Sequence, residues 1–300
     1  MRVLLAGTPQ IAIPIFESIR MSACEVVAVL TNPPRARGRS GALVPSPVHD
    51  WAHQHQLPIH TDLHDPEFIG ALSTVDLVLV VAYGKLIPEA LLHTPKFGWL
   101  NIHFSHLPEA RGAAPVQRLI ESGAREIGYT LFQLDAGMDT GPIWHQIEYE
   151  IPTEASSNEL FDSLSDLGVE AVKASLLEIE KGSEPVPQNG VPSIARKIDK
   201  SECVIDWAKS SDEIWRKVRA FGSNPGVYTT IRGVRIKVLE VKPVVNSEVQ
   251  LPAGSLTPEG IVATGDGAIQ LLKIIPSGKS AMLINDWLNG FKPIPGEAFE

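Results

Sequence analysis

The sequence is poor in cysteine and has no long apolar run, and both absences limit what the chain can be. Its 300 residues include two cysteines, Cys24 and Cys203, which lie far apart with no Cys-x-x-Cys or His-rich spacing around them. This pattern excludes a disulfide framework and indicates no metal site, and it fits the reducing cytosol. No apolar run reaches the roughly 20 residues that span a bilayer. The short apolar run at residues 3–6 is too brief for a signal peptide, so we expect a cytoplasmic protein with no membrane contact.

Three common glycine motifs are also missing. The glycine after the first apolar run, Gly7, stands alone and does not form the G-x-G-x-x-G pattern of dinucleotide-binding proteins. The chain has no P-loop, and Ser105 is not part of a G-x-S-x-G motif. The sequence therefore indicates neither NAD nor ATP-driven chemistry, and it offers no convincing serine or cysteine nucleophile.

The patterning of the first half predicts an α/β fold with a doubly wound, mostly parallel sheet. Residues 2–6 form an apolar run that leads through Gly7 into a segment with helical spacing, which is the opening βα unit of such a sheet. Residues 77–82 are continuously apolar, as expected for a parallel strand buried on both faces. Further strands are expected at 25–30, 57–59, 100–104, 127–134 and 143–151, and further helices at 48–55, 115–122 and after Ser156.

The last third of the chain has a different pattern. Residues 181–192 are rich in Pro and Gly, which is typical of the start of a linker. A helix is expected after Ser210, which has capping-box spacing with Glu213. Short alternating segments at 227–231, 234–241, 260–263 and 269–275 then predict a small antiparallel barrel or sandwich.

The strongest candidate for an active site is the segment around Asn101 and His103. The two residues are separated by one position in a predicted strand, so their side chains project from one face. Pro108 ends the strand soon afterwards, which places the pair near its carboxyl end, where open α/β sheets bind ligands. The alternative is a hydrogen-bonded core histidine beside a turn-forming asparagine.

A loop with two aspartates supplies the third candidate. Residues 135–142 contain Asp135 and Asp139 with two glycines that let the backbone approach a ligand closely. Asp139 is favoured as the functional one and Asp135 as structural, although spacing alone does not separate them. Asn101, His103 and Asp139 suit direct acyl or one-carbon transfer to an amine. His103 and Asn101 would stabilise the oxyanion, and Asp139, or His103 oriented by it, would take the amine proton.

Charge is distributed unevenly along the chain. The formal net charge is −9, yet residues 190–243 hold eleven Lys and Arg against six Asp and Glu. That segment carries +5 and the remainder −14, which suggests that one part of the molecule meets a polyanion. Arg35, Arg37 and Arg39 lie in the acid-free stretch 31–41, which we expect to be an exposed loop without helix or strand and suited to phosphate contacts. The alternative is an ordinary solvated loop.

The ordered motifs resemble those of the methionyl-tRNA formyltransferases, a family of folate-dependent formyltransferases, over almost the full length. The matching segments are Ala6-Gly7-Thr8-Pro9, Pro45-Ser46-Pro47-Val48, Val80-Val81-Ala82-Tyr83-Gly84, Asn101-Ile102-His103, Arg111-Gly112-Ala113-Ala114-Pro115, Met138-Asp139-Thr140-Gly141, Ile205-Asp206-Trp207 and Ala263-Thr264-Gly265-Asp266-Gly267. The resemblance implies a formyl-transfer, folate-binding domain over residues 1–188, a linker over 189–206, and a barrel resembling an OB-fold over 207–300 that contacts tRNA. It also implies transfer of a formyl group from 10-formyltetrahydrofolate to methionyl initiator tRNA. Separately, we expect a monomer.

The same resemblance assigns roles to individual residues. The family's catalytic residues fall on Asn101, His103 and Asp139, with no metal. Folate contacts are expected from Ser105, His106, Leu107 and Pro108, and from Tyr83 and Gly84 on the neighbouring loop. Contacts with tRNA are expected from Arg35, Arg37, Arg39, Arg196, Lys197 and Lys200.

The chain departs from the family pattern at three positions. Phe104 and His106 would reshape the folate pocket, and Glu109 stands where a basic residue is common. Other functions stay open at this stage: formyl transfer to a small amine, hydrolysis of formyltetrahydrofolate, or folate or RNA binding without catalysis.

Overall fold

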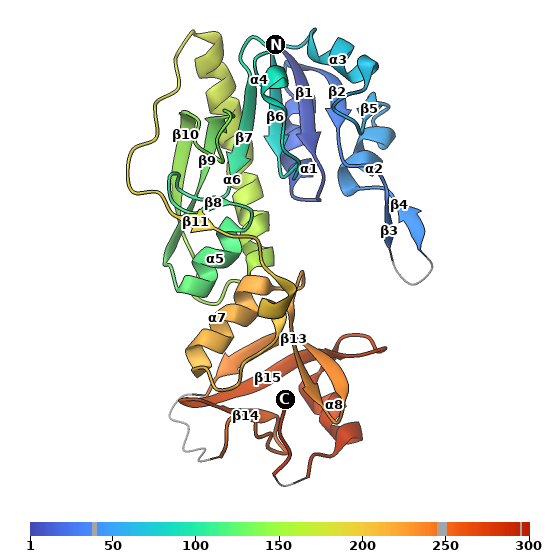
Figure 1. The fold of residues 1–300 in the computed structure, drawn as a ribbon, viewed down its shortest axis with the longest axis vertical. Helices are drawn as coiled ribbons and strands as arrows, with labels where there is room; N and C mark the ends of the chain where they lie inside the picture. The colour runs from blue at the N-terminus through green and yellow to red at the C-terminus, as the bar shows by residue number, and fades with distance from the viewer. Residues whose placement is uncertain (38–40, 245–250, 295) are drawn as a thin grey trace. The chain divides into compact units, whose positions relative to one another are not determined.

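The computed structural model describes residues 1–37, 41–244, 251–294 and 296–300 (Figure 1). The chain divides into two compact units. The first comprises Met1–Pro115, Glu126–Tyr149 and Phe161–Ala195, and the second comprises Val116–Arg125, Glu150–Leu160 and Arg196–Glu300. None of the helices in the described part of the chain has the length and apolar character needed to cross a membrane.

The first unit is built on a mostly parallel sheet, as predicted. Within the described residues its seven strands run in the order β10-β9-β7-β6-β1-β2-β5. The strands are β1 (Arg2–Gly7), β2 (Glu25–Leu30), β5 (Ile59–His60), β6 (Leu77–Val81), β7 (Trp99–His103), β9 (Glu126–Gln133) and β10 (Ile143–Glu150). The pairs from β5 to β7 are parallel, and β7 pairs antiparallel with β9. All five residues of β6 are buried, which confirms the expectation for a central parallel strand.

Capping residues mark the starts of two helices that contribute to this unit. Ser46 precedes α2 (Pro47–Gln54), and its Oγ accepts a hydrogen bond from the N–H of His49 at 3.0 Å. Ser156 precedes α6 (Ser157–Glu180), which begins in the second unit and belongs to the first from Phe161 onward, and its N–H donates to the Glu159 carboxylate at 2.8 Å. These contacts satisfy main-chain N–H groups that have no partner within the helix. The remaining helices are α1 (Ala12–Arg20), α3 (Pro66–Leu72) and α4 (Glu89–Leu92).

The arginine-containing stretch is not the unstructured loop that the sequence suggested. Residues Arg35–Arg37 form β3, which pairs antiparallel with β4 (Ala42–Val44), so that Arg35 lies opposite Val44. The prediction of no strand here was wrong because Arg-Ala-Arg lacks the apolar face by which half-buried strands are recognised. This exposed hairpin is held by the main-chain hydrogen bonds between β3 and β4.

A second short strand pair was also missed. Strand β8 (Arg111–Gly112) pairs in parallel with β11 (Ile194–Ala195), and both lie in the first unit. Gly112 has φ +114°, and a Cβ at this position would lie 2.8 Å from the carbonyl oxygen of Ala195. The close approach of the two main chains therefore requires glycine at this position.

The second unit contains the antiparallel strands expected from the alternating segments. Its sheet runs in the order β12-β13-β15-β14, and β16 pairs with β15. The strands are β12 (Val227–Ile231), β13 (Val234–Pro243), β14 (Ile261–Thr264), β15 (Gly267–Pro276) and β16 (Met282–Leu283). The helical elements are α5 (Pro115–Ser122), the 3₁₀ turn Lys200–Cys203, α7 (Ser211–Phe221) and α8 (Ile284–Phe291). The capping box of Ser210 and Glu213 at the start of α7 is confirmed.

Candidate active site

A cavity of about 690 Å³ opens at the carboxyl ends of β6 and β7 in the first unit. Asn101 and His103 line it from β7, Tyr83 and Gly84 line it from the loop after β6, and Asp139 lines it from the loop after β9. The structure therefore brings together the three candidate catalytic residues. The loop after β6 lies beside Asn101 and His103 because β6 and β7 are parallel neighbours. Strand β9 is antiparallel to β7 and ends opposite Leu100, so the loop that follows it must turn back along the sheet to bring Asp139 to His103.

His103 is buried, with 6% of its surface exposed, and its tautomer follows from its hydrogen bond. Its Nε2 lies 2.9 Å from the carbonyl oxygen of Ala110. A carbonyl only accepts, so Nε2 carries the proton and donates it. Burial lowers the pKa of His103, although Asp139 and the hydrogen bond to Ala110 act in the opposite direction. The ring is therefore neutral near pH 7, and Nδ1 presents a lone pair 3.8 Å from the Asp139 carboxylate.

Asp139 is held by contacts at its side chain and at its main chain. Its carboxylate accepts a hydrogen bond from the N–H of Gly112 at 2.7 Å. Its carbonyl oxygen accepts another from the Gln188 side chain at 2.9 Å. Asp139 has φ +53°, a left-handed conformation that is uncommon outside glycine. The surrounding loop thus orients the carboxylate toward His103.

Asp135 has a different environment in the same loop. Its Oδ1 accepts hydrogen bonds from the N–H of Gly137 at 3.0 Å and from the Thr140 hydroxyl at 2.7 Å. These local contacts stabilise the turn that carries Asp139. The distinction between a structural Asp135 and a functional Asp139 is consistent with this geometry.

The segment expected to contact folate lies beside the cavity. Ser105 is fully buried, and its hydroxyl donates to the carbonyl oxygen of Glu109 at 2.5 Å. Thr130 accepts from the N–H of Leu107 at 3.1 Å, while His106 lies 3.6 Å from the Glu148 carboxylate. The cavity lining includes Phe104 but none of residues 105–108. The ring of Phe104 packs edge-on against Phe161, with the centroids 5.8 Å apart, and Glu109 is exposed.

The loop after β6 is fixed by a residue that the sequence did not single out. The Asn32 side chain, 5% exposed, donates to the carbonyl oxygen of Tyr83 and to the Thr8 hydroxyl, both at 2.8 Å. Burial, with a smaller effect of Asp62, raises the pKa of Tyr83 to about 12. The Tyr83 ring therefore acts as a neutral, largely apolar wall. Asn32 could not be identified from the sequence because its partners lie 24 and 51 positions away.

The candidate tRNA-binding residues lie in both units. Arg35 is exposed on β3 of the first unit; Arg37 lies on the same strand, and Arg39 lies outside the described residues. Arg196, Lys197 and Lys200 are exposed in the second unit. No group of three or more potential metal ligands occurs within the described ranges 1–37, 41–244, 251–294 and 296–300.

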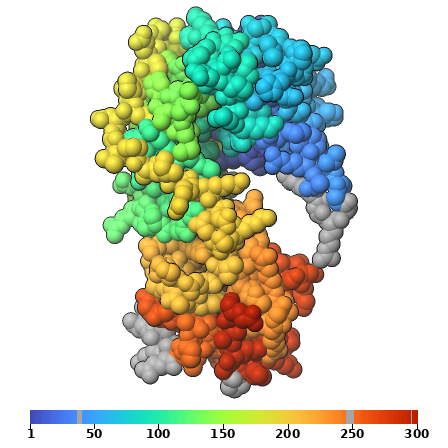
Figure 2. Space-filling model, in the orientation of Figure 1, coloured from blue at the N-terminus to red at the C-terminus, as the bar shows by residue number. Residues whose placement is uncertain are grey.

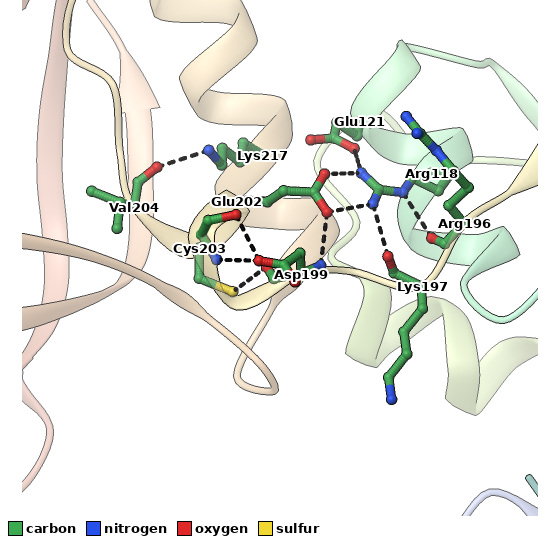
Figure 3. A network of polar contacts seen from close by, with 10 residues as sticks. Arg118, Glu121, Arg196, Lys197, Asp199, Glu202, Cys203, Val204 and Lys217 are labelled. Atoms are coloured by element: carbon green, nitrogen blue, oxygen red, sulfur yellow. Dashed lines mark hydrogen bonds and ion pairs between the residues drawn. The ribbon is translucent and has the colours of Figure 1, made fainter.

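The segment that carries Arg196 and Lys197 is held by Arg118 (Figure 3). The Arg118 guanidinium donates to both carboxylate oxygens of Glu202 at 2.8 Å and to the carbonyl oxygen of Arg196 at 3.1 Å. Glu121 accepts a further hydrogen bond at 2.7 Å. Arg118 thus binds the main chain of the basic segment, and the ammonium group of Lys197 extends away from the network (Figure 3).

Comparisons with known proteins agree with the resemblance. A model of the formyl transferase family matches residues 1–176, and a model of the formyl transferase C-terminal domain matches residues 197–292. The methionyl-tRNA formyltransferase of Salinispora tropica is 38% identical over 306 residues, covering 99% of each chain.

Two solved structures share the fold. HypX from Aquifex aeolicus, determined in complex with tetrahydrofolic acid, has a TM-score of 0.65 and 18% identity over 97% of this chain and 47% of its own. The chain thus spans about half of the length of HypX. Methionyl-tRNA formyltransferase from Clostridium thermocellum has a TM-score of 0.62 and 16% identity, over 82% of this chain and 95% of its own. Because the family model covers more than half of the sequence and the Salinispora relative aligns over nearly all of it, the chain belongs to the formyl transferase family, and within it to the methionyl-tRNA formyltransferases.

Proposed function

We propose that this protein transfers a formyl group from 10-formyltetrahydrofolate to the free amino group of methionyl initiator tRNA. The observation that carries the proposal is the convergence of Asn101, a neutral His103 and Asp139 on one cavity. Such a set can activate an amine and stabilise an oxyanion without a covalent intermediate. Membership of the family and the name of the Salinispora relative support this choice of donor and acceptor.

The cavity suits a folate-type donor. Its walls include the apolar side chains of Val80, Ile87, Leu92 and Leu134, against which a flat heteroaromatic ring can pack. The loops at 82–87 and 134–139 also contribute non-helical main chain to the lining, which offers N–H and C=O groups to a polar ring edge. Tyr83 and Gly84 would contact the donor directly, and residues 105–108 would shape the adjoining wall.

The proposed mechanism uses the tautomer of His103. Because Nε2–H is donated to Ala110, Nδ1 accepts the proton that the amine loses as it attacks the formyl carbon. The Asp139 carboxylate, 3.8 Å away, stabilises the imidazolium that forms. The Asn101 amide donates to the formyl oxygen as it gains negative charge, and the protonated ring becomes able to donate as well. The proton on Nδ1 then passes to the leaving nitrogen of the donor, so His103 returns to its starting state.

The basic residues support a polyanionic acceptor. Arg35 and Arg37 on one unit and Arg196, Lys197 and Lys200 on the other would contact tRNA phosphates, and Arg39 is proposed to do the same. Formyl transfer to a small amine needs no such residues. For this reason tRNA is favoured over an amino sugar or another small acceptor.

A transfer assay tests the proposal. Radiolabelled formyl transfer from 10-formyltetrahydrofolate would be measured with methionyl initiator tRNA, methionyl elongator tRNA, an amino sugar nucleotide and water as acceptors. We expect transfer confined to the initiator. Release of formate without transfer would support a hydrolase, and transfer to the sugar alone would support a small-amine enzyme; either result would overturn the proposed acceptor.

Further features belong to the same proposal. We assign residues 1–188 to formyl transfer, 189–206 to a linker, and 207–300 to a barrel resembling an OB-fold that contacts tRNA. Strand β13 supports the barrel because its pairing with β15 has register shifts on both sides of Glu240, and bulges of this kind bend a sheet. We also propose that the protein is a monomer and acts in the cytoplasm, where translation begins.

A further inference from the structure

Gln188 lies in a segment that the sequence predicts only as the start of a linker. Residues 181–195 run along the outside of the first unit (Figure 2), and most of them are exposed. Gln188 is half-buried, and Val186, two positions earlier in the chain, exchanges two main-chain hydrogen bonds with Ile143. These hydrogen bonds hold the segment 181–195 next to the loop that carries Asp139.

The amide of Gln188 uses its full hydrogen-bonding capacity. Its Oε1 accepts from Nε and Nη2 of Arg111, at 3.2 and 2.6 Å. Its Nε2 donates to the carbonyl oxygens of Asp139 and Gly141, both at 2.9 Å. An arginine only donates and a carbonyl only accepts, so these partners determine which end of the amide is oxygen. The side-chain amide of Gln188 therefore fits these partners in one orientation.

These contacts close a ring around Asp139. The Arg111 side chain binds Gln188, and Gln188 binds the main chain of Asp139. Residue 112, next to Arg111 in the chain, donates its N–H to the Asp139 carboxylate. The main chain and the side chain of Asp139 are therefore both tied to strand β8. A residue with φ +53° keeps that conformation only where its surroundings require it.

We propose that Gln188 is a positioning residue that, together with Arg111, holds the main chain of Asp139 in the conformation that directs its carboxylate at His103. The inference rests on the proposed function, because Asp139 and His103 act there as one unit. Gln188 contacts neither donor nor acceptor; it acts through Asp139.

The proposal predicts a change that a general loss of stability would not cause. Among the described residues, Asp139 is the ionisable group that acts on the pKa of His103, and the Ala110 carbonyl is its other polar neighbour. Asp139 raises this pKa against the effect of burial. If the carboxylate moves away, the pKa of His103 falls further, and the acidic limb of the rate profile shifts to lower pH.

The test compares Gln188→Met, which keeps the length and removes all four hydrogen bonds, with Gln188→Glu. The glutamate still accepts from Arg111 but sets a carboxylate against two carbonyl oxygens. We expect kcat to fall at least tenfold in both variants, with KM for donor and tRNA within twofold of the unchanged protein. Gln54→Met, at an exposed position of helix α2, is the matched control and should leave all constants unchanged.

Two readouts make the test decisive. In a double-mutant cycle, the double variant Arg111→Met/Gln188→Met should lose no more activity than the less active of the two single variants. Each single substitution already breaks the same ring of contacts around Asp139. NMR titration of the His103 ring should give a lower pKa in Gln188→Met than in the unchanged protein, and this readout needs no acceptor. If the proposed acceptor is wrong, the unchanged protein already fails to formylate initiator tRNA. The inference itself is overturned if the variants keep kcat within twofold of the unchanged protein, or if the pKa of His103 in them equals that of the unchanged protein. If Gln188→Met does not fold, the same criteria apply to Gln188→Glu.

Discussion

At the scale of single residues, the chemistry depends on how one carboxylate is placed against one buried imidazole. Asp139 lies 3.8 Å from Nδ1 of His103 and stabilises its charged form only. We predict that Asp139→Asn lowers kcat by about a hundredfold or more, the usual range for a positioned acid–base group. In the pH–rate profile of the variant, the acidic limb should lie at lower pH than in the profile of the unchanged protein. Steady-state rates across pH would measure both effects.

Asp135→Asn is the matched control for this variant. Asp135 lies in the same loop and binds Gly137 and Thr140, so its replacement changes local stability without removing a charge next to His103. We expect it to keep more than a tenth of kcat and an unchanged acidic limb. If both variants lost activity equally, Asp139 would have no special role.

His103 also links stability to pH. Burial lowers its pKa below the ordinary value of 6.5, so the unfolded chain binds the proton more readily than the folded protein. The free energy of unfolding should therefore decrease as pH falls from 6.5 to the lowered pKa, and the His103 contribution should be constant above 6.5. Urea unfolding at several pH values would measure this slope. His103→Gln should show a smaller decrease over the same window; an identical slope would contradict the buried neutral ring.

At the scale of secondary-structure elements, the short pair of β8 and β11 supports the site. Gly112 has φ +114° and no room for a Cβ beside Ala195. We predict that Gly112→Ala lowers the free energy of unfolding by roughly 1–3 kcal/mol, since it adds backbone strain and a contact of 2.8 Å. It should also lower kcat, because the displaced N–H no longer binds Asp139. Gly70→Ala on helix α3, where the added Cβ meets open space, should leave kcat unchanged and not destabilise the protein.

Arg118 has a comparable role in the second unit. It holds the main chain at Arg196 and pairs with Glu202, and these contacts keep the pKa of the Glu202 carboxyl below its usual range. We predict that Arg118→Met raises KM for tRNA severalfold with kcat and KM for donor nearly unchanged, because residues 196–200 lose their fixed path. The loss of stability should be about 1 kcal/mol, since the pair is partly exposed. Arg125→Met provides a charge-matched control, and equal KM values for the two variants would contradict this role.

The elements show where sequence reasoning succeeds. Asn101 and His103 could be placed on one face because the two-residue period of a strand needs no tertiary information. The central strand β6 was recognisable from its unbroken apolar run. The β3–β4 hairpin was missed because it buries no face, and the β8–β11 pair was missed because its strands are two residues long and 83 positions apart, from Arg111 to Ile194. Gln188 was missed for the same reason, as its partner Arg111 lies 77 positions away.

At the scale of the whole molecule, charge and binding site must be considered together. The protein carries a net charge of −9 and would bind a polyanion poorly if its charges were evenly mixed. Residues 190–243 nevertheless carry +5, and Arg196, Lys197 and Lys200 within them are exposed. Attraction between residues 190–243 and a polyanion therefore acts against repulsion between the polyanion and the rest of the protein. Added salt screens both, but contacts with phosphates also release counterions, and that effect dominates the salt dependence.

We predict that KM for tRNA rises steeply with salt while KM for donor changes little, because the donor cavity is largely apolar. In duplex DNA each phosphate contact contributes about 0.9 to the slope of log affinity against log salt. Replacing Arg196, Lys197 and Lys200 together by glutamine should therefore reduce the slope by roughly two to three. Glutamine at Lys173 and Lys181, which are exposed in the first unit, is the control and should leave the slope unchanged. Equal slopes in the two variants would mean that the basic segment is an ordinary solvated surface, and the tRNA contacts would have to come from other residues.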